Sequence, residues 1–418
     1  MDIKEKILLG REERANIIKE YLKEYQTVLS IKANLVGSEK NSYLSYLLIN
    51  AFSFLIRELK PGKNIYNFND DGPYLLLLFN NDLSKDIKRL TIAYENNHEL
   101  GRFVDIDVYN CNGQISRETK RKCYLCDDIA YNCIVSMKHS QTELLNFMEE
   151  KILKFYKDLI TEIIDSSILA ELNLQPKFGL VTPDSSGSHK DMDYDLMIKA
   201  KDAIIPYLVE VFFVSLGKTN YNTLSHELKK IGKTAETAMF EATSNINAYK
   251  GLVFNLGLMI ASYSIKISLY TNDTIYEISQ SLAKNILEEP KFDSSSFGDK
   301  AYQKFNLLGV KGEALSGYKN IQKGYNYLKE ISAYDMFETL KYYIINVEDT
   351  SFLKRAGSLE FYKEVKFLFS KINTNDLNDI QEMTNFCIEK NLSFGGSADL
   401  LVVTVFLKKV SKISINLF

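Results

Sequence analysis

The sequence lacks several features that define broad classes of proteins. Lys and Arg total 51 against 54 Asp and Glu, so the basic excess of a general nucleic-acid-binding protein is missing. No run reaches the roughly 18 apolar residues that a membrane helix needs, because Asn255 and Lys266 interrupt the most apolar stretch, residues 251–270. We therefore expect neither a nucleic-acid partner nor a membrane-inserted segment.

The sequence also shows neither the pattern of a signal peptide nor that of a disulfide framework. The first residues, MDIKEKILLGREER, contain no apolar core. The five cysteines are an odd number, and four of them lie between residues 111 and 133, unlike the framework of a secreted protein. With 45% hydrophobic and 25% charged residues, the composition is that of a globular protein. The sequence thus predicts a cytoplasmic, globular protein.

Arginine is scarce and unevenly distributed. Seven of the eight arginines lie in the first 121 residues, and only Arg355 follows. A planar guanidinium suits bidentate phosphate contacts, so the skew indicates a phosphate-rich ligand in the first part, with separate ancestry of two domains as the alternative. The candidates for phosphate contact there are Arg11, Arg14, Arg117 and Arg121.

The periodicity of the chain changes once. At 418 residues, two or three domains are expected. The patterns predict helices over 3–26, 43–59 and 83–97, strands over 27–36, 73–79 and 101–110, and an irregular, Cys-rich stretch over 116–140. From 141, beginning with a helix over 141–172, the pattern is almost wholly helical. We expect an α+β domain over residues 1–150 and an all-α, multi-helical domain over residues 151–418.

One constellation in the first part suits phosphate chemistry. Asp105 and Asp107 lie in a strand pattern, where side chains at i and i+2 share a face. Two adjacent carboxylates repel unless a cation bridges them, and Mg²⁺ is the natural cation beside phosphates. Arg102 precedes them, and a GSEKNS turn offers Lys40 and Ser42 for phosphate binding. The outline is that of a nucleotidyltransferase-like sheet with two Mg²⁺ ligands, and a solvated strand face is the alternative.

The Cys-rich stretch has the spacing of a zinc site. Cys123, Cys126, Cys133 and His139 form the pattern C-x₂-C-x₆-C-x₅-H. A C-x-x-C pair is a suitable zinc chelate, and three cysteines with one histidine form a familiar structural set. The chain has no second C-x-x-C, and reduced, buried cysteines beside a surface histidine are the alternative.

The segment PDSSGSHKDMDYD, residues 183–195, is the densest candidate site of the second part. Gly187 and Ser188 precede a helical run and are expected to offer backbone N–H groups to an anion. Asp191 and Asp195 are expected to share a helix face, where like charges are unfavourable unless a cation or substrate binds. The segment also contains His189 and Asp193, and a capped, solvated helix start is the alternative.

Three further segments place glycine and polar residues beside apolar helix. They are NAYKG (247–251), KGEALSG (311–317) and SFGGSADL (393–400). Glycine in a helical region indicates close approach to a ligand or another backbone, and helix–helix contact is the alternative. The candidate site residues in these segments are Lys250, Glu313, Gly395, Gly396 and Ser397.

At this level of detail the chain resembles two known families. The first part resembles the citrate lyase holo-acyl-carrier-protein synthases, also called apo-citrate lyase phosphoribosyl-dephospho-CoA transferases. The matching segments are LLGREER (8–14), VLSIKANLVGSEKNS (28–42), LGRFVDIDVY (100–109), ISRETKRKCYLC (115–126) and KHS (138–140).

The second part resembles the triphosphoribosyl-dephospho-CoA synthases. The matching segments are QPKFGLVTPDSSGSHKDMD (175–193), GKTAETAMFEAT (232–243), NAYKGLVFNLGL (247–258), YQKFNLLGVKGEALSGY (302–318), EDTSFLKRAG (348–357) and LSFGGSADLL (392–401). Together the two resemblances cover nearly the whole chain in order, so the chain looks like a fusion of both enzymes.

The resemblance implies a bifunctional transferase. The second domain would join ATP to 3'-dephospho-CoA and release adenine, when the 2'-hydroxyl of the CoA ribose attacks C1 of the ATP ribose. The first domain would transfer the product to a serine of the apo-citrate lyase acyl carrier protein and release pyrophosphate. Asp105, Asp107, Arg102 and Lys40 suit attack on an α-phosphorus beside Mg²⁺.

Adenine displacement needs a carboxylate near an oxocarbenium-like centre, an acid for the leaving base and cations for the triphosphate. The candidates are His189, Asp191, Asp193, Lys250 and Glu313. The aspartates are assigned to metal or base roles, the histidine to acid or phosphate contact, the lysine to phosphate, and the glutamate to an alternative base.

The second part departs from its family at two histidine positions, where this chain has Tyr249 and Phe297. An alternative hypothesis is therefore an active transferase fused to a degenerate helical domain that only binds dephospho-CoA or the carrier. A related transferase serving malonate decarboxylase is a third possibility, although the REER, GRFVDIDV and CYLC segments favour the citrate lyase branch.

Overall fold

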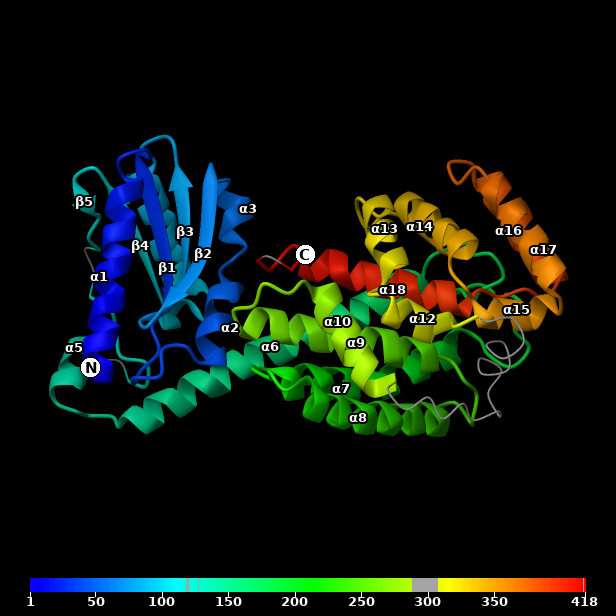
Figure 1. Ribbon diagram of the computed structural model, residues 1–418, viewed down its shortest axis with the longest axis horizontal. Coiled ribbons are helices and arrows are strands. Elements are labelled where there is room, and N and C mark those ends of the chain that lie inside the picture. Colours follow the sequence, from blue (N-terminus) through cyan, green and yellow to red (C-terminus); the bar gives the residue numbers. More distant parts are fainter. Residues whose placement is uncertain (118–119, 127, 288–306, 416) are drawn as a thin grey trace. The chain divides into compact units, whose positions relative to one another are not determined.

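The computed structural model describes residues 1–117, 120–126, 128–287, 307–415 and 417–418 (Figure 1). The chain forms two compact units. Unit 1 comprises residues 1–159, 267–271 and 412–416, and unit 2 comprises residues 160–266, 272–411 and 417–418. Helix α6 (Gln141–Leu172) begins in unit 1 and ends in unit 2. The expected boundary at residue 150 therefore lies inside a continuous helix.

Unit 1 is built on a five-stranded antiparallel sheet with the strand order β2-β3-β1-β4-β5. Strand β3 is buried along its whole length between two neighbours, as its run of leucines predicts. The strands are β1 (Thr27–Ala33), β2 (Lys63–Asn69), β3 (Gly72–Phe79), β4 (Val104–Asn110) and β5 (Gly113–Gln114).

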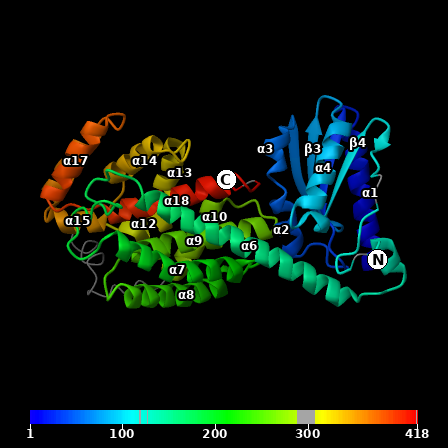
Figure 2. The same cartoon turned by 180° about the vertical axis from the view of Figure 1, so that it is seen from behind.

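Helices cover both faces of this sheet (Figures 1 and 2). On one face, Ile18 of α1 packs against Val28, Tyr74, Leu76 and Leu78. Helices α2 and α4 pack on the sheet from the other side. The helices of unit 1 are α1 (Ile3–Tyr21), α2 (Tyr43–Ala51), α3 (Leu55–Leu59), α4 (Ser84–Asn97), α5 (Ala130–Val135) and the first part of α6.

The alternation of β4 places its two aspartates on one face. Asp105 and Asp107 are half-buried there, while the residues between and beside them are buried on the opposite face. In the register with β1, Lys32 lies opposite Asp105, and Ser30 lies opposite Asp107. The sheet therefore carries a polar stripe across the neighbouring strands β1 and β4, on the face against which α1 packs.

A buried carboxylate anchors α1 to the sheet beside this stripe. The side chain of Asp71 is 0% exposed and accepts from Arg14 and Lys32 over 2.7 Å each, and from Arg11 over 3.1 Å. Although burial acts in the opposite direction, the hydrogen bonds and charges of Lys32 and Arg14 hold the pKa of Asp71 below its usual range. The network joins α1, β1 and the β2–β3 turn.

Unit 2 consists of helices and loops throughout its described residues, apart from one isolated bridge between Thr182 and Ser185. Helix α18 is buried over most of its length, and α13, α14 and α15 pack against it. The helices are α7 (Tyr194–Ser215), α8 (Tyr221–Ala242), α9 (Lys250–Ser268), α10 (Ile275–Leu287), α12 (Gly309–Leu315), α13 (Lys319–Tyr327), α14 (Ala333–Asn346), α15 (Thr350–Ala356), α16 (Leu359–Ser370), α17 (Leu377–Glu389) and α18 (Gly395–Val410).

Helix α9 is long and apolar enough to cross a membrane by length and composition alone. However, 78% of its most apolar 18-residue window is buried inside the fold. Burial of this kind is typical of the central helix of an all-α unit.

Several predicted elements require correction. The helix expected over 3–26 ends at Tyr21, and that expected over 43–59 is broken into α2 and α3 by a turn. Strand β2 was not predicted, because its polar residues alternate with few strongly apolar ones. The pattern over 101–110 begins with a 3₁₀ turn, Gly101–Phe103, before β4. By contrast, α6 has the bounds that the pattern predicts.

The Asp71 network yields a stability prediction. Asp71→Asn should destabilise unit 1 by about 2–3 kcal/mol, less than a fully buried pair because Arg11 is half exposed. Since the folded pKa is lowered, this contribution exists above the unfolded pKa and disappears as pH falls through the folded value.

Urea unfolding monitored by hydrogen exchange in α1 and β1, at neutral and acidic pH, would measure the difference. The adjacent, exposed Asp70→Asn is the matched control and should change stability by less than about 0.5 kcal/mol. Equal effects of the two substitutions would contradict the prediction.

Candidate functional sites

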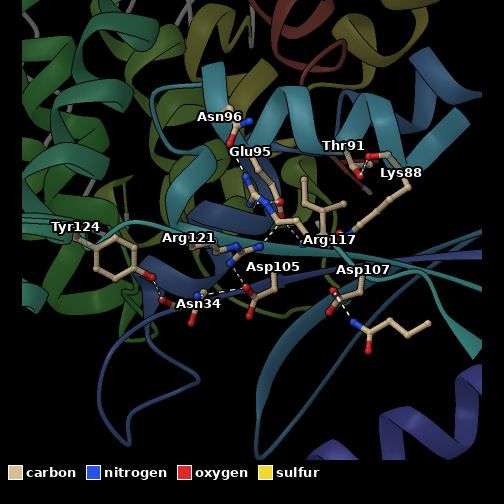
Figure 3. Close-up of polar contacts among 12 residues, drawn as sticks. Asn34, Lys88, Thr91, Glu95, Asn96, Asp105, Asp107, Arg117, Arg121 and Tyr124 are labelled. Atoms are coloured by element: carbon tan, nitrogen blue, oxygen red, sulfur yellow. Dashed lines mark hydrogen bonds and ion pairs between the residues drawn. The ribbon is translucent and has the colours of Figure 1, made fainter. Parts of the chain in front are cut away.

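The first candidate site surrounds Asp105 and Asp107 in unit 1 (Figure 3). Arg121 and Asn34 both donate to Oδ1 of Asp105, the latter over 3.3 Å. Gln114 donates to Oδ1 of Asp107 over 2.9 Å. Burial, and then the negative charge of Asp105, raises the pKa of Asp107. The two carboxylates are thus close enough to repel, as their spacing predicts.

Two arginines expected to contact phosphate are held by a buried glutamate that the sequence did not reveal. Glu95 of α4 is 2% exposed and accepts from Arg117 over 3.0 Å and from Arg121. It also accepts the backbone N–H of Ile106 over 3.0 Å, at the edge of β4. Arg121 therefore bridges Glu95 and Asp105, and both guanidiniums are preorganised beside the aspartates (Figure 3).

The remaining predicted residues of unit 1 lie around this stripe. Lys40 donates to the carbonyl of Leu35, and burial, followed by the charge of Lys32, lowers the pKa of Lys40. Ser42 is the N-cap residue of α2. The Arg102 guanidinium lies 5.8 Å from the centre of the Tyr124 ring, and its buried Nε has no hydrogen-bond partner within the described chain.

The turn beside Lys40 depends on a glycine. Gly72 has a φ of +101°, and a Cβ there would lie 2.7 Å from the backbone oxygen of Lys40. This close approach brings the loop that carries Lys40 against the turn that carries Asp71. Arg11, Arg14, Lys40 and the unpredicted Lys32 therefore gather beside Asp71, where their charges influence one another.

The donor set of this site fits Mg²⁺. Mg²⁺ is bound through one or two carboxylates together with phosphate oxygens and water. Asp105 and Asp107 provide two carboxylates on one face. Burial, and then the charge of Asp105, raises the pKa of Asp107, and a divalent cation would relieve the repulsion between the two carboxylates. The surrounding arginines and lysines would face the phosphates that accompany such an ion.

The four predicted zinc ligands lie together. Cys123, Cys126, Cys133 and His139 each offer one ligand atom, and these atoms all lie within 4.8 Å of one another. The chain between the first and third cysteines includes the start of α5, and the histidine precedes α6.

The second candidate site is a cavity of about 740 Å³ in unit 2. Its walls come from the end of α6, the loop before α7, the starts of α9, α15 and α18, and from α12. Ser188, His189, Asp191, Lys250, Glu313, Gly395 and Gly396, all predicted from the sequence, line it. Residues from six distant segments thus converge on one concave site.

His189 is held as a neutral imidazole in this wall. Its Nδ1 lies 3.0 Å from Nη2 of Arg355, which can only donate, so Nε2 carries the proton and donates to Ser393 Oγ over 2.9 Å. Burial, and then the charge of Arg355, lowers the pKa of His189 to about 4. At neutral pH the imidazole is uncharged, which favours a role in positioning Arg355 over the expected role as an acid.

Asp349 joins two helix starts at the cavity wall. Its carboxylate accepts from Ser351 and Phe352 at the start of α15, and from the backbone and hydroxyl of Ser397 in α18. Burial raises the pKa of Asp349. A Cβ on Gly396 would lie 3.1 Å from this carboxylate. The predicted Ser397 and Gly396 therefore bind and accommodate Asp349.

Two other carboxyl groups of the cavity are strongly perturbed. Glu313 accepts from Asn320 through Oε1, while its buried Oε2 has no partner within the described chain, and burial raises its pKa. Burial, and then the charges of Asp349 and Glu171, raises the pKa of Asp399 well above its usual value. Both groups line the cavity, and burial makes each of them more basic than a solvated carboxylate.

Tyr249 also lines the cavity, at the first departure from the family pattern. Its hydroxyl is buried and has no hydrogen-bond partner in the described part of the chain. The second departure, Phe297, lies outside the described residues.

Three expectations for the loop before α7 are corrected. The backbone N–H groups of Gly187 and Ser188 donate to Ser185 Oγ and to the Gly179 carbonyl, so neither is available to an anion. Asp191 precedes α7 and shares no helix face with Asp195, because Asp193 is the N-cap and accepts from Leu196. The side chain of Asp193 is thereby used in capping.

Lys250 begins α9 and forms a 3.0 Å ion pair with Glu236. Sequence reasoning missed Lys32, Glu95, Arg355, Asp349 and Asp399 as site residues. Signals existed for some of them: Arg355 is the single arginine after residue 121, and Asp349 and Asp399 lie in the segments EDTSFLKRAG and LSFGGSADLL. Their convergence depends on helix packing that no local pattern encodes.

Comparison with known families divides the chain at α6. A family model described as apo-citrate lyase phosphoribosyl-dephospho-CoA transferase matches residues 3–155. A second, described as ATP:dephospho-CoA triphosphoribosyl transferase, matches residues 157–416. The first match covers the sheet, and the second covers the helical region that contains the cavity.

Individual relatives have the same arrangement. A protein named CitXG from Leuconostoc mesenteroides subsp. cremoris is 30% identical, over 97% of this chain and 96% of its own length. Its namesake from Haemophilus influenzae is 27% identical, over 96% and 95%. A 2-(5''-triphosphoribosyl)-3'-dephosphocoenzyme-A synthase from Haemophilus ducreyi is 29% identical, over 68% of this chain and 98% of its own length.

The His189–Arg355 contact yields a titration prediction. The His189 imidazole should titrate near pH 4 in an NMR pH titration, below the usual value of about 6.5, because its surroundings disfavour the charged form. Arg355→Gln removes the positive charge and should raise this pKa. A pKa near 6.5 for His189 in the parent protein, or no change in Arg355→Gln, would contradict the geometry.

Proposed function

Because the chain belongs to the family that joins an apo-citrate lyase phosphoribosyl-dephospho-CoA transferase to an ATP:dephospho-CoA triphosphoribosyl transferase, we propose that its two units perform the two steps in turn. The chain makes and attaches the prosthetic group of citrate lyase. Unit 2 would make the group from ATP and 3'-dephospho-CoA, and unit 1 would attach it to the acyl carrier protein of the lyase.

One observation carries the assignment of unit 2. Its 740 Å³ cavity places carboxyl groups of raised pKa in the same space as Lys250, Lys354 and Arg355. A triphosphate needs the cations, and exchange at the ribose C1 needs a base and an acid. In this step the bond from C1 of the ATP ribose to adenine breaks, and a bond forms from C1 to the 2'-oxygen of dephospho-CoA.

The two perturbed carboxyl groups suit the two proton transfers. Glu313 would accept the proton of the attacking 2'-hydroxyl, because its Oε2 lacks another partner among the described residues and its raised pKa makes the carboxylate more basic. Asp399 would supply the proton to the leaving adenine, because burial, and then the charges of Asp349 and Glu171, raise its pKa well above the usual value and favour the protonated form. Arg355, oriented by neutral His189, would bind phosphate.

Unit 1 suits the second step. The serine oxygen of the carrier protein attacks the α-phosphorus of the triphosphoribosyl group, and the bond to the departing pyrophosphate breaks. Asp105 and Asp107 would hold Mg²⁺, which stabilises charge on the phosphorus and the leaving group when bound. Arg121 and Lys32 lie beside Asp105 and would face the phosphate oxygens. The sheet with its paired aspartates supports a nucleotidyltransferase-like assignment.

Separate substitutions should separate the two activities. Asp105→Asn should reduce transfer to the apo-carrier protein by at least 100-fold and leave adenine release unchanged, because Asp105 lies in unit 1. Transfer would be followed by the mass increase of the carrier, with purified prosthetic-group precursor supplied. Asp70→Asn is the matched control and should preserve both activities. Equal loss of both activities in a folded Asp105→Asn protein would contradict the division of labour.

The acid assignment predicts a change in the pH profile of adenine release. For the parent protein with ATP, Mg²⁺ and 3'-dephospho-CoA, kcat/KM should fall as pH rises and Asp399 loses its proton. Asp399→Asn should lower the rate by about 100-fold or more and remove this alkaline limb.

Adenine release that requires dephospho-CoA would support synthesis despite Tyr249. No adenine from well-folded parent protein that still binds dephospho-CoA would instead favour the degenerate binding domain. Retention of the alkaline limb in Asp399→Asn would assign the acid role to another group.

A further inference from the structure

We propose that Cys123, Cys126, Cys133 and His139 bind one structural Zn²⁺, and that this zinc site holds Arg121 and Tyr124 in place beside Asp105. The first half concerns metal binding alone. The second half rests on the proposed transfer at Asp105. The two halves can be tested separately, because zinc content is measured without any enzymatic assay.

The geometry of the four side chains fits tetrahedral coordination. The Sγ atom of Cys126 lies 3.4 Å from both Cys133 Sγ and His139 Nε2. Zinc–sulfur bonds of about 2.3 Å in a tetrahedral site separate two sulfur ligands by about 3.8 Å. The observed 3.4 Å contacts and the 4.8 Å limit on the whole set bracket this value. Shifts of the ligand atoms by a few tenths of an ångström would therefore give the spacing that one zinc ion requires.

In the segment around α5 the cysteines are buried and the larger apolar side chains are exposed, unlike the arrangement in an ordinary hydrophobic core. Cys123 and Cys133 are only 9% and 6% exposed. The larger apolar side chains of α5 and its flanks point outward instead, with exposed fractions of 70% for Tyr131, 73% for Ile134, 65% for Val135 and 86% for Met137. A segment that turns its cysteines inward and its hydrophobic groups outward gains little from the hydrophobic effect, and a metal ion would supply the missing stabilisation.

Ligand chemistry identifies the ion. Three thiolates with one imidazole form a soft, closed set without a position for water, as in structural zinc sites. The remaining described cysteines lie elsewhere: Cys111 is exposed, and Cys387 is buried in unit 2. The same two cysteines provide controls for substitution.

The zinc site is linked to Asp105 through neighbouring residues of the chain and through hydrogen bonds. Cys123 lies between Arg121, which contacts Asp105, and Tyr124, whose hydroxyl donates to the carbonyl of Asn34 over 3.4 Å. The backbone N–H of Ala130 donates to the Arg121 carbonyl over 2.9 Å, which ties the start of α5 to the arginine. Loss of the ion would release the loop that presents Arg121 and Tyr124.

Metal analysis of the purified chain tests the first half. We expect one zinc per chain, loss of that zinc in Cys133→Ser and His139→Ala, and retention in Cys111→Ser and Cys387→Ser. His139→Cys should restore binding through four thiolates, and Co²⁺ exchanged for the zinc should give the visible bands of tetrahedral thiolate coordination. A parent protein with reduced thiols and no zinc, a Cys126–Cys133 disulfide, or zinc retained in Cys133→Ser would overturn the site.

Parallel assays of one sample test the second half. In zinc-depleted parent protein and in Cys133→Ser, the rate of transfer to the carrier protein should fall at least tenfold. The rate of adenine release should stay within twofold of that of the zinc-loaded parent. Adding Zn²⁺ back should restore the depleted parent, and not Cys133→Ser. Zinc loss with unchanged transfer would refute the positioning role. If Asp105→Asn transfers normally, the proposed transfer site is wrong, and the zinc content still decides the first half.

Discussion

Glu95 is the residue on which the site of unit 1 depends. Its carboxylate is almost completely removed from water, and removal of one partner from such a buried pair costs about 3–5 kcal/mol. Burial raises the pKa of Glu95, and Arg121, the backbone of β4 and Arg117 offset that effect only in part. These contacts fix both arginines in place. Helix α4, the sheet and the Cys-rich loop are thereby tied to one another. Because Nη2 of Arg121 contacts Glu95, Nη1 remains available to donate to Asp105. The same set of contacts therefore stabilises unit 1 and arranges the residues of its candidate site.

The two units solve different chemical problems in different ways. In the proposed attachment the site must admit a carrier protein, and the aspartates of β4 lie on a half-exposed sheet face with the cations around them. In the proposed synthesis an electron-poor ribose carbon must be protected from water, and unit 2 provides a concave cavity among helices instead. Burial in that cavity raises the pKa of Glu313 and of Asp399, whereas a solvated position would leave the pKa of each carboxyl group near its usual value.

Local patterns predicted what depends on a few neighbouring residues. The D-x-D spacing fixed the shared face of Asp105 and Asp107, and the cysteine spacing anticipated four side chains that do lie together. The same reasoning failed for Gly187 and Ser188, because their N–H groups donate to neighbouring turns that the pattern does not display. It also missed partners from distant elements, because Glu95 comes from α4 and Asp399 comes from α18. Such partners are set by helix packing, and no periodicity in one segment encodes it.

Gly396 shows how such packing restricts which substitutions the protein tolerates. The carboxylate of Asp349 lies where a Cβ at position 396 would be crowded, and four hydrogen bonds leave that carboxylate little freedom to withdraw. Substitution of either residue alone disturbs the junction of α15 and α18. The two positions are therefore expected to evolve as a pair. A lineage that lost the glycine would have to replace the aspartate as well, and would reshape the cavity wall when it did so.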